Sequence, residues 1–355
     1  MKSLIKAASL TAFFMFAILL SNAKAAENDN GGIPEFSVTA PVGVNYIWHM
    51  LSIGGIDYFD VDYMQKYSNT ISAENLLLLK QSYTYLQMKN NPNGFLAFPF
   101  IILPAYLNLN SEDEIQNYYY ALSTAIEKNN FAELLFNYKV NFEDIYLKRY
   151  KGYLSISSDS ISNLYNANDK ENLKKLALIF ADGFHNYLTQ VWPIAKQELE
   201  NAIPNFQSAY SKTAKYQSWK EITGLSYLSK KYESVLCYAM QKGLNGVTVG
   251  YGRDVFYHNP DSQEFKQFLN HKIGTHFLSN LYNEYKTTSD TANKRFNEAF
   301  EVLVYHYNRR MIGRSELKYN LDIPDDFIYL LIFEKGDQLK LNPGAMLIKG
   351  VEEYR

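Results

Sequence analysis

The sequence predicts an α+β protein that is predominantly α-helical and carries a small antiparallel sheet. Apolar residues recur at helical spacing through most of the first 230 residues, and breakers such as Gly54 and Gly55 separate the runs. Between Ser234 and His258 the pattern changes to short apolar runs with glycine-containing turns, which is typical of strands. The composition, 47% hydrophobic and 20% charged residues, is that of a folded chain.

The first 25 residues have the features of a signal peptide. Lys2 and Lys6 precede an apolar run at 10–20, and Ala-Lys-Ala at 23–25 fits the small-x-small cleavage pattern. The apolar run is shorter than the roughly 20 residues that a transmembrane helix needs. We therefore expect cleavage before Ala26 and an exported chain, periplasmic or extracellular, with no transmembrane anchor after cleavage.

The mature chain is expected to be moderately acidic. Loss of Lys2, Lys6 and Lys24 leaves 32 of the 35 basic residues against 37 acidic ones, a net charge of −5. A nucleic-acid surface needs a basic stripe, so we expect no nucleic-acid partner. The single cysteine, Cys237, cannot form an internal disulfide, and stability must come from the core.

Residues 36–230 are expected to form a mainly helical region after a flexible mature start at 26–35. A short strand at 36–40 opens the region. Ser111 and Glu114 form a capping box, in which each side chain accepts a hydrogen bond from the backbone N–H of the other residue. The predicted helices span 42–53, 72–89, 111–128, 131–150, 170–201 and 205–230.

Two pairs of prolines interrupt this helical region. Pro99 and Pro104 argue against a single regular helix over 94–109, because proline lacks a backbone N–H and crowds the preceding turn. Pro193 and Pro204 predict kinks or joints between the later helices.

Residues 231–355 form the second predicted region, although no clear linker separates it from the first and the two can be one continuous domain. A strand is predicted at 234–240, followed by a hairpin over 245–258. Asp261 and Ser289 are the predicted caps of two long helices. These helices run over 261–285 and 289–312, with another at 324–334 and a strand within 339–349.

The first long helix of the second region contains a histidine motif. Residues 268–278 read Phe-Leu-Asn-His-Lys-Ile-Gly-Thr-His-Phe-Leu. This stretch resembles the His-Glu-x-x-His helix of the zincin metallopeptidases, and more narrowly that of secreted bacterial zincin-like proteins in families described as domains of unknown function. In that register His271 keeps the first metal-ligand position, Lys272 replaces the general base and Thr275 replaces the second ligand. His276 follows one residue later.

The spacing of the two histidines opposes a shared metal ion. Residues four apart on a helix lie about 40° from each other, whereas His271 and His276 lie about 140° apart. Both could reach one zinc ion only if the helix were distorted, for example by a π-bulge at Gly274. The expected environments are one partly exposed histidine and one packed or hydrogen-bonded histidine. Lys272 further opposes metal binding, because its ammonium would repel the ion.

The resemblance implies that a third zinc ligand would come from the following helix. Glu298 and Glu301 are the candidates, but both are expected on the face away from the apolar stripe of that helix and therefore in solvent. His306 lies at the edge of the stripe and is interpreted as structural.

We therefore interpret the chain as a zincin-like protein that has lost its peptidase activity. No catalytic residue, no metal and no cofactor are expected. The resemblance also implies a groove in which a peptide adds a strand to the sheet edge, so a peptide or protein is the expected partner.

Two other interpretations stay open. One is an active zinc-dependent hydrolase with a shifted metal site made by His271, His276 and Glu298, which requires the bulge near Gly274. The other is a purely structural helical envelope protein, in which residues 268–278 have no chemical role.

Overall fold

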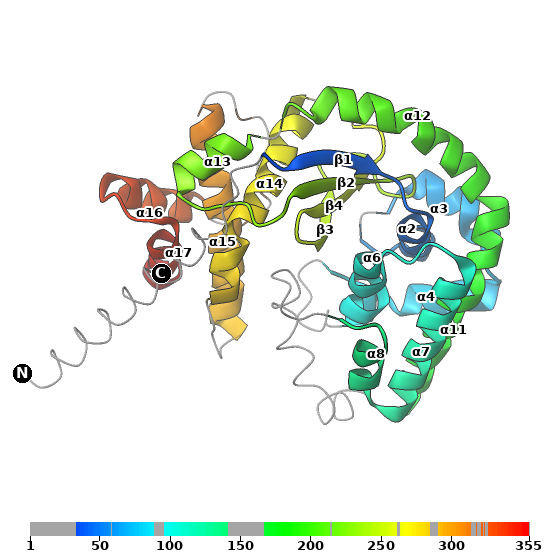
Figure 1. Cartoon of the computed structure of the whole chain (residues 1–355). Helices are drawn as coiled ribbons and strands as arrows, with labels where there is room; N and C mark the ends of the chain where they lie inside the picture. The colour runs from blue at the N-terminus through cyan, green and yellow to red at the C-terminus, as the bar shows by residue number, and fades with distance from the viewer. Residues whose placement is uncertain are drawn as a thin grey trace, which may run out of the picture. The chain divides into compact units, whose positions relative to one another are not determined.

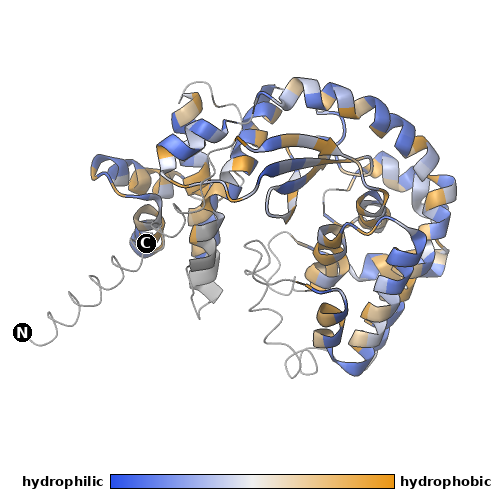
Figure 2. Cartoon of the chain, viewed as in Figure 1, coloured by the Kyte–Doolittle hydropathy of each residue, from blue (hydrophilic) through white to orange (hydrophobic). Residues whose placement is uncertain are grey.

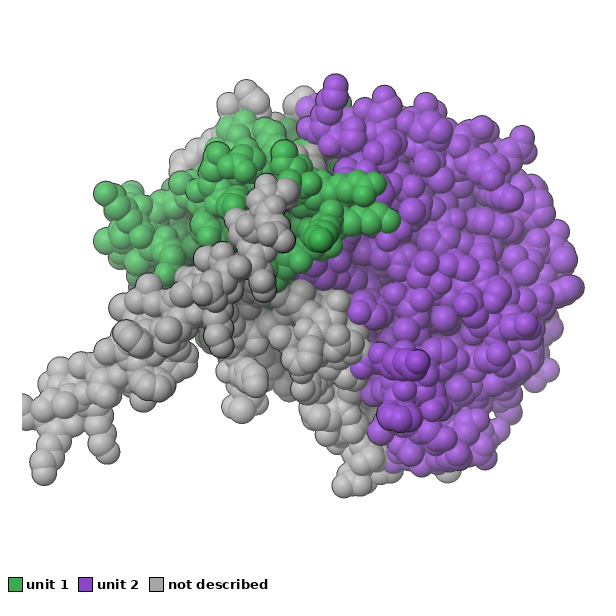
Figure 3. All heavy atoms as spheres, viewed as in Figure 1, with its two compact units in different colours: residues 1–35, 213–232, 266–355 green, residues 36–212, 233–265 purple. Residues whose placement is uncertain are grey.

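The computed structural model of the chain describes residues 33–57, 59–88, 96–140, 167–213, 215–260, 263–284, 290–313, 317, 321, 323 and 326–354. The predicted signal peptide, most of the flexible start and the proposed caps Asp261 and Ser289 lie outside these residues. The chain divides into two compact units, coloured separately in Figure 3. Unit 1 comprises residues 1–35, 213–232 and 266–355, and unit 2 comprises residues 36–212 and 233–265. This division differs from the predicted boundary after residue 230, because the hairpin belongs with the N-terminal helices.

Unit 2 is mainly helical, as the sequence predicts (Figure 1). The predicted helix at 72–89 is broken at Ser82, whose hydroxyl donates to the carbonyl of Leu78 at 2.8 Å. Pro193 lies in the first turn of a new helix, as expected of a joint, whereas Pro204 lies inside that helix. The helical segments are α2 (Val42–Gly54), α3 (Val61–Tyr67), η1 (Ser68–Thr70), α4 (Ala73–Gln81), α5 (Tyr83–Leu86), η3 (Phe98–Ile102), α6 (Leu103–Leu107), α7 (Glu112–Lys128), α8 (Phe131–Asn137), α11 (Ala167–Gln190) and α12 (Trp192–Tyr210).

The four-stranded sheet lies almost wholly in unit 2 and has the order β1-β2-β4-β3. Its strands are β1 (Glu35–Thr39), β2 (Lys231–Cys237), β3 (Gly246–Gly250) and β4 (Arg253–Tyr257). The predicted hairpin is confirmed by the antiparallel pairing of β3 with β4. Strands β2 and β4 are parallel, so the sheet is mixed and not purely antiparallel as expected. The chain reverses after β2 and again after β3, and β4 then inserts beside β2.

Buried tyrosines complete the hydrogen bonding of the proline-containing segment. Pro104 has no N–H, so the carbonyl groups four and five residues earlier, those of Phe100 and Pro99, lose a helical donor. The hydroxyls of Tyr119 and Tyr118 donate to these two oxygens at 2.8 Å and 2.6 Å. The segment accordingly forms a π-helical turn, η3, followed by α6, and not a single regular helix.

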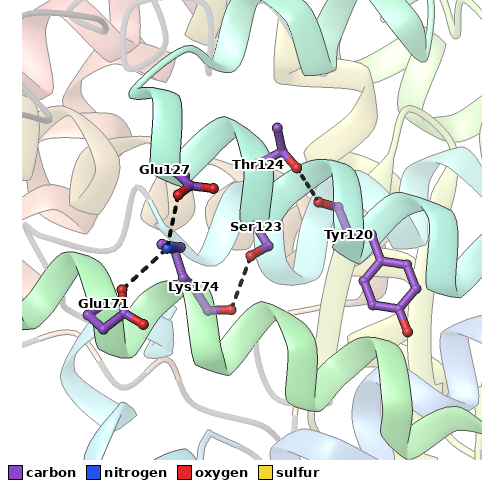
Figure 4. Close-up of polar contacts among 6 residues, drawn as sticks. All are labelled: Tyr120, Ser123, Thr124, Glu127, Glu171 and Lys174. Atoms are coloured by element: carbon purple, nitrogen blue, oxygen red, sulfur yellow. Dashed lines mark hydrogen bonds and ion pairs between the residues drawn. The ribbon is translucent and has the colours of Figure 1, made fainter.

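Helices α7 and α11 pack side by side, and polar contacts fix their register (Figure 4). Lys174 of α11 lies between Glu127 of α7 and Glu171 of its own helix, with its ammonium 3.3 Å from each carboxylate. The Ser123 hydroxyl donates to the backbone carbonyl of Lys174 at 3.4 Å.

Along α12, hydrophilic and hydrophobic residues alternate (Figure 2), which is typical of a helix with one buried face.

A buried charge joins α6 to the sheet. The Arg253 guanidinium donates to the carbonyl of Ala105 at 2.7 Å and to the side chain of Asn108 at 2.6 Å, at the end of α6. Its Nε lies 3.1 Å from the carboxylate of Glu233 on β2, which also accepts from the hydroxyl of Thr39 on β1. The buried cation is therefore paired and hydrogen-bonded, as burial requires.

His49 is fully enclosed among the aromatic residues of unit 2. The Thr70 hydroxyl donates to the carbonyl of Tyr67, so it accepts from His49 Nε2 at 3.0 Å. Nδ1 then accepts from the Tyr63 hydroxyl at 2.8 Å, which assigns the Nε2–H tautomer. Burial lowers the pKa of His49 to about 3, so the ring is neutral at pH 7.

We expect this histidine to make unit 2 less stable in acid. The folded pKa is about 3 and the ordinary value is 6.5, so below pH 6.5 only the unfolded chain takes up the proton. The contribution of neutral His49 to the free energy of unfolding is present in full above that pH. It falls by about 1.4 kcal/mol per pH unit between pH 6.5 and pH 3. Urea unfolding of wild type and His49→Gln at pH 7 and 5 measures the difference in slope. If the free energy of unfolding changed equally with pH in the two proteins, His49 would not be the neutral, buried histidine described above.

Unit 1 contains the two long helices that the sequence predicts near the C-terminus. The predicted strand within 339–349 is wrong, because this segment enters a helix whose N-terminus is capped by Asn342, which accepts from the Ala345 N–H at 2.8 Å. The helices are α13 (Tyr216–Thr223), α14 (Gln263–Glu284), α15 (Asp290–Ile312), α16 (Asp326–Gln338) and α17 (Pro343–Glu353). No helix in the described part of the chain is long and apolar enough to cross a bilayer.

Candidate functional site

The histidine motif lies on α14, which is a regular α-helix throughout its length. Gly274 lies against the indole of Trp219, and a Cβ at this glycine would come within 2.1 Å of the Trp219 ring. The glycine therefore provides room for a buried side chain of α13. The π-bulge required by a shifted metal site is absent.

His271 is buried and contacts a carboxylate of the next helix. The side chain is 2% exposed, and its Nε2 lies 3.3 Å from Glu301 Oε2 of α15. His271 is therefore not a partly exposed histidine. Glu301 lies on the solvated face of α15, as expected, with 44% of its side-chain surface exposed. The angle around α15 placed Glu301 off the apolar stripe, but a long side chain at the edge of a helix face can reach its neighbour.

Thr275 and Lys272 occupy the other two positions of the motif. The Thr275 hydroxyl donates to the carbonyl of His271, one turn earlier, at 3.3 Å. Such a backbone hydrogen bond is common for threonine within a helix and keeps the hydroxyl close to its own helix. Lys272 is half-buried beside His271 in the sequence.

His276 has different surroundings from His271. It is also 2% exposed, and its ring lies 5.8 Å from the ring of Tyr232 and 6.5 Å from that of Tyr227. Both histidines are buried, so the expected packed histidine is present and the expected partly exposed one is not. Because His271 contacts α15 and His276 contacts aromatic rings, the structure does not bring the two imidazoles to a common point.

Glu298 and His306 of α15 each contact a residue of α16. Glu298 Oε2 accepts from the Tyr329 hydroxyl at 3.2 Å. Burial, and then the Glu298 carboxylate, raise the pKa of Tyr329. His306 Nε2 lies 2.9 Å from Asp337 Oδ2, and burial lowers the pKa of His306. The two candidate carboxylates thus have separate positions, and Glu301 is the one beside His271.

A buried amide network, which the sequence did not indicate, holds α13, α14 and α15 together. Asn270 donates to the Asn308 side chain at 2.6 Å, and Asn308 donates to the carbonyl of Gln267 at 3.0 Å. The Trp219 indole N–H and the Lys215 backbone N–H both reach Asn270 Oδ1 at 3.2 Å. The feature of the sequence that could have predicted this network is the presence of asparagines at apolar positions of the helices. The network fixes the two helices that carry His271 and Glu301.

The resulting arrangement offers one imidazole and one carboxylate to a ligand. Zinc sites in proteins use three or four side-chain ligands. Among the described residues, no group of three or more histidine, cysteine, aspartate or glutamate side chains is placed to hold a metal ion.

No family model, curated protein or solved structure matches this chain.

Proposed function

We propose that this protein is an exported zincin-like protein that has lost zinc-peptidase activity and binds a peptide or another protein. One observation carries the proposal. The motif helix keeps His271 next to Glu301, while lysine and threonine stand where a peptidase needs a base and a second imidazole.

The position of Glu301 supports the resemblance to glutamate-type zincins. In those enzymes the helix after the histidine helix supplies the third ligand, and here α15 follows α14 and places a carboxylate 3.3 Å from His271. Two of the three ligand positions thus keep suitable side chains and lie side by side. The third is Thr275, whose hydroxyl is hydrogen-bonded to its own helix.

The two substitutions explain why this scaffold would not hydrolyse peptides. A zinc peptidase needs a carboxylate that accepts a proton from the metal-bound water. Lys272 cannot supply that carboxylate, and its positive charge disfavours the ion itself. The resemblance implies a groove, and such a groove could hold an extended peptide through backbone hydrogen bonds without cleaving it.

The first test is the metal content of the mature protein. After incubation with zinc at neutral pH and removal of free metal, we expect far less than one zinc per chain by elemental analysis. His271→Ala should leave the content unchanged. One equivalent of zinc in wild type that disappears in His271→Ala would contradict the proposal, and hydrolysis of casein blocked by a chelator would do so independently.

A purely structural role is the second candidate, and the burial of His271 and His276, each 2% exposed, favours it. A peptide-display screen on the immobilised mature protein separates the two candidates. The binding role predicts that peptides are selected and that their affinity falls in Lys272→Glu, because the half-buried Lys272 occupies the general-base position of the motif. Failure to select any peptide would favour the structural role.

A further inference from the structure

Helix α16 is apolar on all sides of its first two turns, although only one side of it is buried. Residues 327–333 are seven consecutive apolar residues, which surround the helix axis completely. The buried side chains, which face the neighbouring helices α15 and α17, are those of Tyr329, Ile332 and Phe333. On the opposite side, Phe327 and Leu331 keep 58% and 63% of their surface exposed. A helix that is apolar on all sides is normally buried, so the exposed side of α16 indicates a contact surface.

The exposed side chains of this surface follow one ridge of the helix. Phe327, Leu331, Lys335 and Leu339 are four positions apart, and all four are exposed. Leu339 directly follows α16, and its N–H donates to the carbonyl of Lys335 at 3.1 Å, so it continues the last helical turn. Residues at this spacing form the ridges that most often pack helix against helix, each ridge lying in a groove of the other helix. We call these four residues the α16 ridge.

The charges at the two ends of the α16 ridge match those of a second, antiparallel copy. Asp326 precedes Phe327 at the start of α16, and Lys340 follows Leu339 beyond its end. In an antiparallel pair whose two-fold axis lies level with Phe333, Asp326 of each copy lies beside Lys340 of the other. The same pairing puts Phe327 beside Leu339, so the surface is complementary to itself, as a two-fold interface requires. A parallel pair would place like charges together.

A lipid surface matches the α16 ridge less well. Helices that lie on membranes carry basic residues along their polar side and are drawn to anionic lipids. The apolar end of the α16 ridge begins at Asp326, which an anionic surface would repel.

We propose that two copies of this protein associate through the α16 ridge, with the two α16 helices antiparallel. A single pair of helices buries less than the roughly 1,200 Å² of a stable interface, so the dimer is weak, with a dissociation constant on the order of 10 µM. His271 and Glu301 are not part of the α16 ridge, so this inference and the proposed function succeed or fail separately.

Sedimentation of the full mature chain over a series of concentrations tests the association. We expect a reversible equilibrium between monomer and dimer. A chain that stays monomeric at concentrations well above the expected dissociation constant would overturn the proposal. Binding of that monomer to phosphatidylglycerol vesicles would then assign the α16 ridge to a lipid surface.

Two substitutions test whether the α16 ridge makes the contact. Leu331→Lys should weaken association by about tenfold or more, because it brings a second ammonium beside Lys335 of the other copy. Phe327→Ser should weaken it by removing apolar contact area. Both side chains are exposed in the monomer, so the denaturation midpoint should not fall. Leu178→Lys, at a leucine of α11 in unit 2 that is 39% exposed, is the matched control and should not change association. Unchanged association in both ridge variants would overturn the proposal.

Charge reversal tests the antiparallel arrangement. Asp326→Lys and Lys340→Asp should each weaken self-association by about threefold to tenfold, because each places like charges together at both ends of the dimer. An equal mixture of the two variants should associate as tightly as the wild type, since the mixed dimer has opposite charges at both ends. If the mixture associates no more tightly than either variant alone, the antiparallel dimer is wrong.

Discussion

Replacing Gly274 by alanine should destabilise unit 1 by about 3 kcal/mol, the upper end of the usual cost of overpacking a core. The new Cβ would lie 2.1 Å and 2.3 Å from two carbons of the Trp219 ring, far inside van der Waals contact. The indole cannot simply rotate away, because it is fully buried and its N–H is hydrogen-bonded to Asn270. Urea unfolding followed by circular dichroism measures the loss.

Gly344 provides the matched control for this substitution. It lies in α17 of the same unit, and a Cβ there would meet its nearest neighbours at 3.5 Å, an ordinary contact. Gly344→Ala should therefore be neutral or stabilise by up to about 1 kcal/mol through helix propensity. Equal stability of Gly274→Ala and Gly344→Ala would show that the indole does not occupy the space over Gly274.

Local signals in the sequence predicted much of the fold because they act within a few residues. The predicted capping box is present: the side chains of Ser111 and Glu114 each accept a hydrogen bond from the backbone N–H of the other residue. Gly55 ends α2 in the left-handed conformation, with φ at 67°. The strand predicted within 339–349 was wrong because the apolar residues of this segment were interpreted as a strand. Asn342 and Pro343 form a helix-start signal there.

Long-range pairing was the part that sequence could not supply. The residues of β2 do not indicate that its neighbour is β4 and not β3, since both strands of the hairpin contain apolar residues that can pack beside it. The parallel pairing in turn places Tyr238 and His258, 20 positions apart in the sequence, in one cluster.

The histidine motif shows the same division between local and distant information. Helical angles separated His271 from His276, and the structure gives the two rings different neighbours. The same angles placed Glu301 on the solvated face, where its side chain is 44% exposed. They did not indicate its contact with His271, because they describe Cα positions and not the reach of a flexible side chain. The Asn270 network was missed because its partners lie 38 and 51 residues away.

Introducing the two residues that the zincin motif requires, at positions 272 and 275, should give the protein a zinc site. In the variant Lys272→Glu/Thr275→His, imidazoles four residues apart would lie on one face of α14, about 40° from each other. Glu301 already lies 3.3 Å from His271 Nε2 and would supply the third ligand. Three protein ligands and a water are the usual shell of a catalytic zinc. We expect one zinc per chain at micromolar metal, against almost none in wild type, measured by elemental analysis and by competition with a chromogenic chelator.

The controls assign this gain to the zincin-like geometry and not to added histidine alone. Adding His271→Ala or Glu301→Gln to the double variant should weaken zinc binding by about tenfold to a hundredfold or more, because each removes a ligand and an incomplete shell holds the ion poorly. Lys272→Glu by itself should bind little zinc, since the second imidazole is still missing. If the double variant takes up no zinc while it folds with wild-type stability, α14 and α15 do not have the spacing of a zincin, and the inferred ancestry of the site is wrong. Zinc uptake that survives His271→Ala would be equally damaging, because the ion would then be held elsewhere.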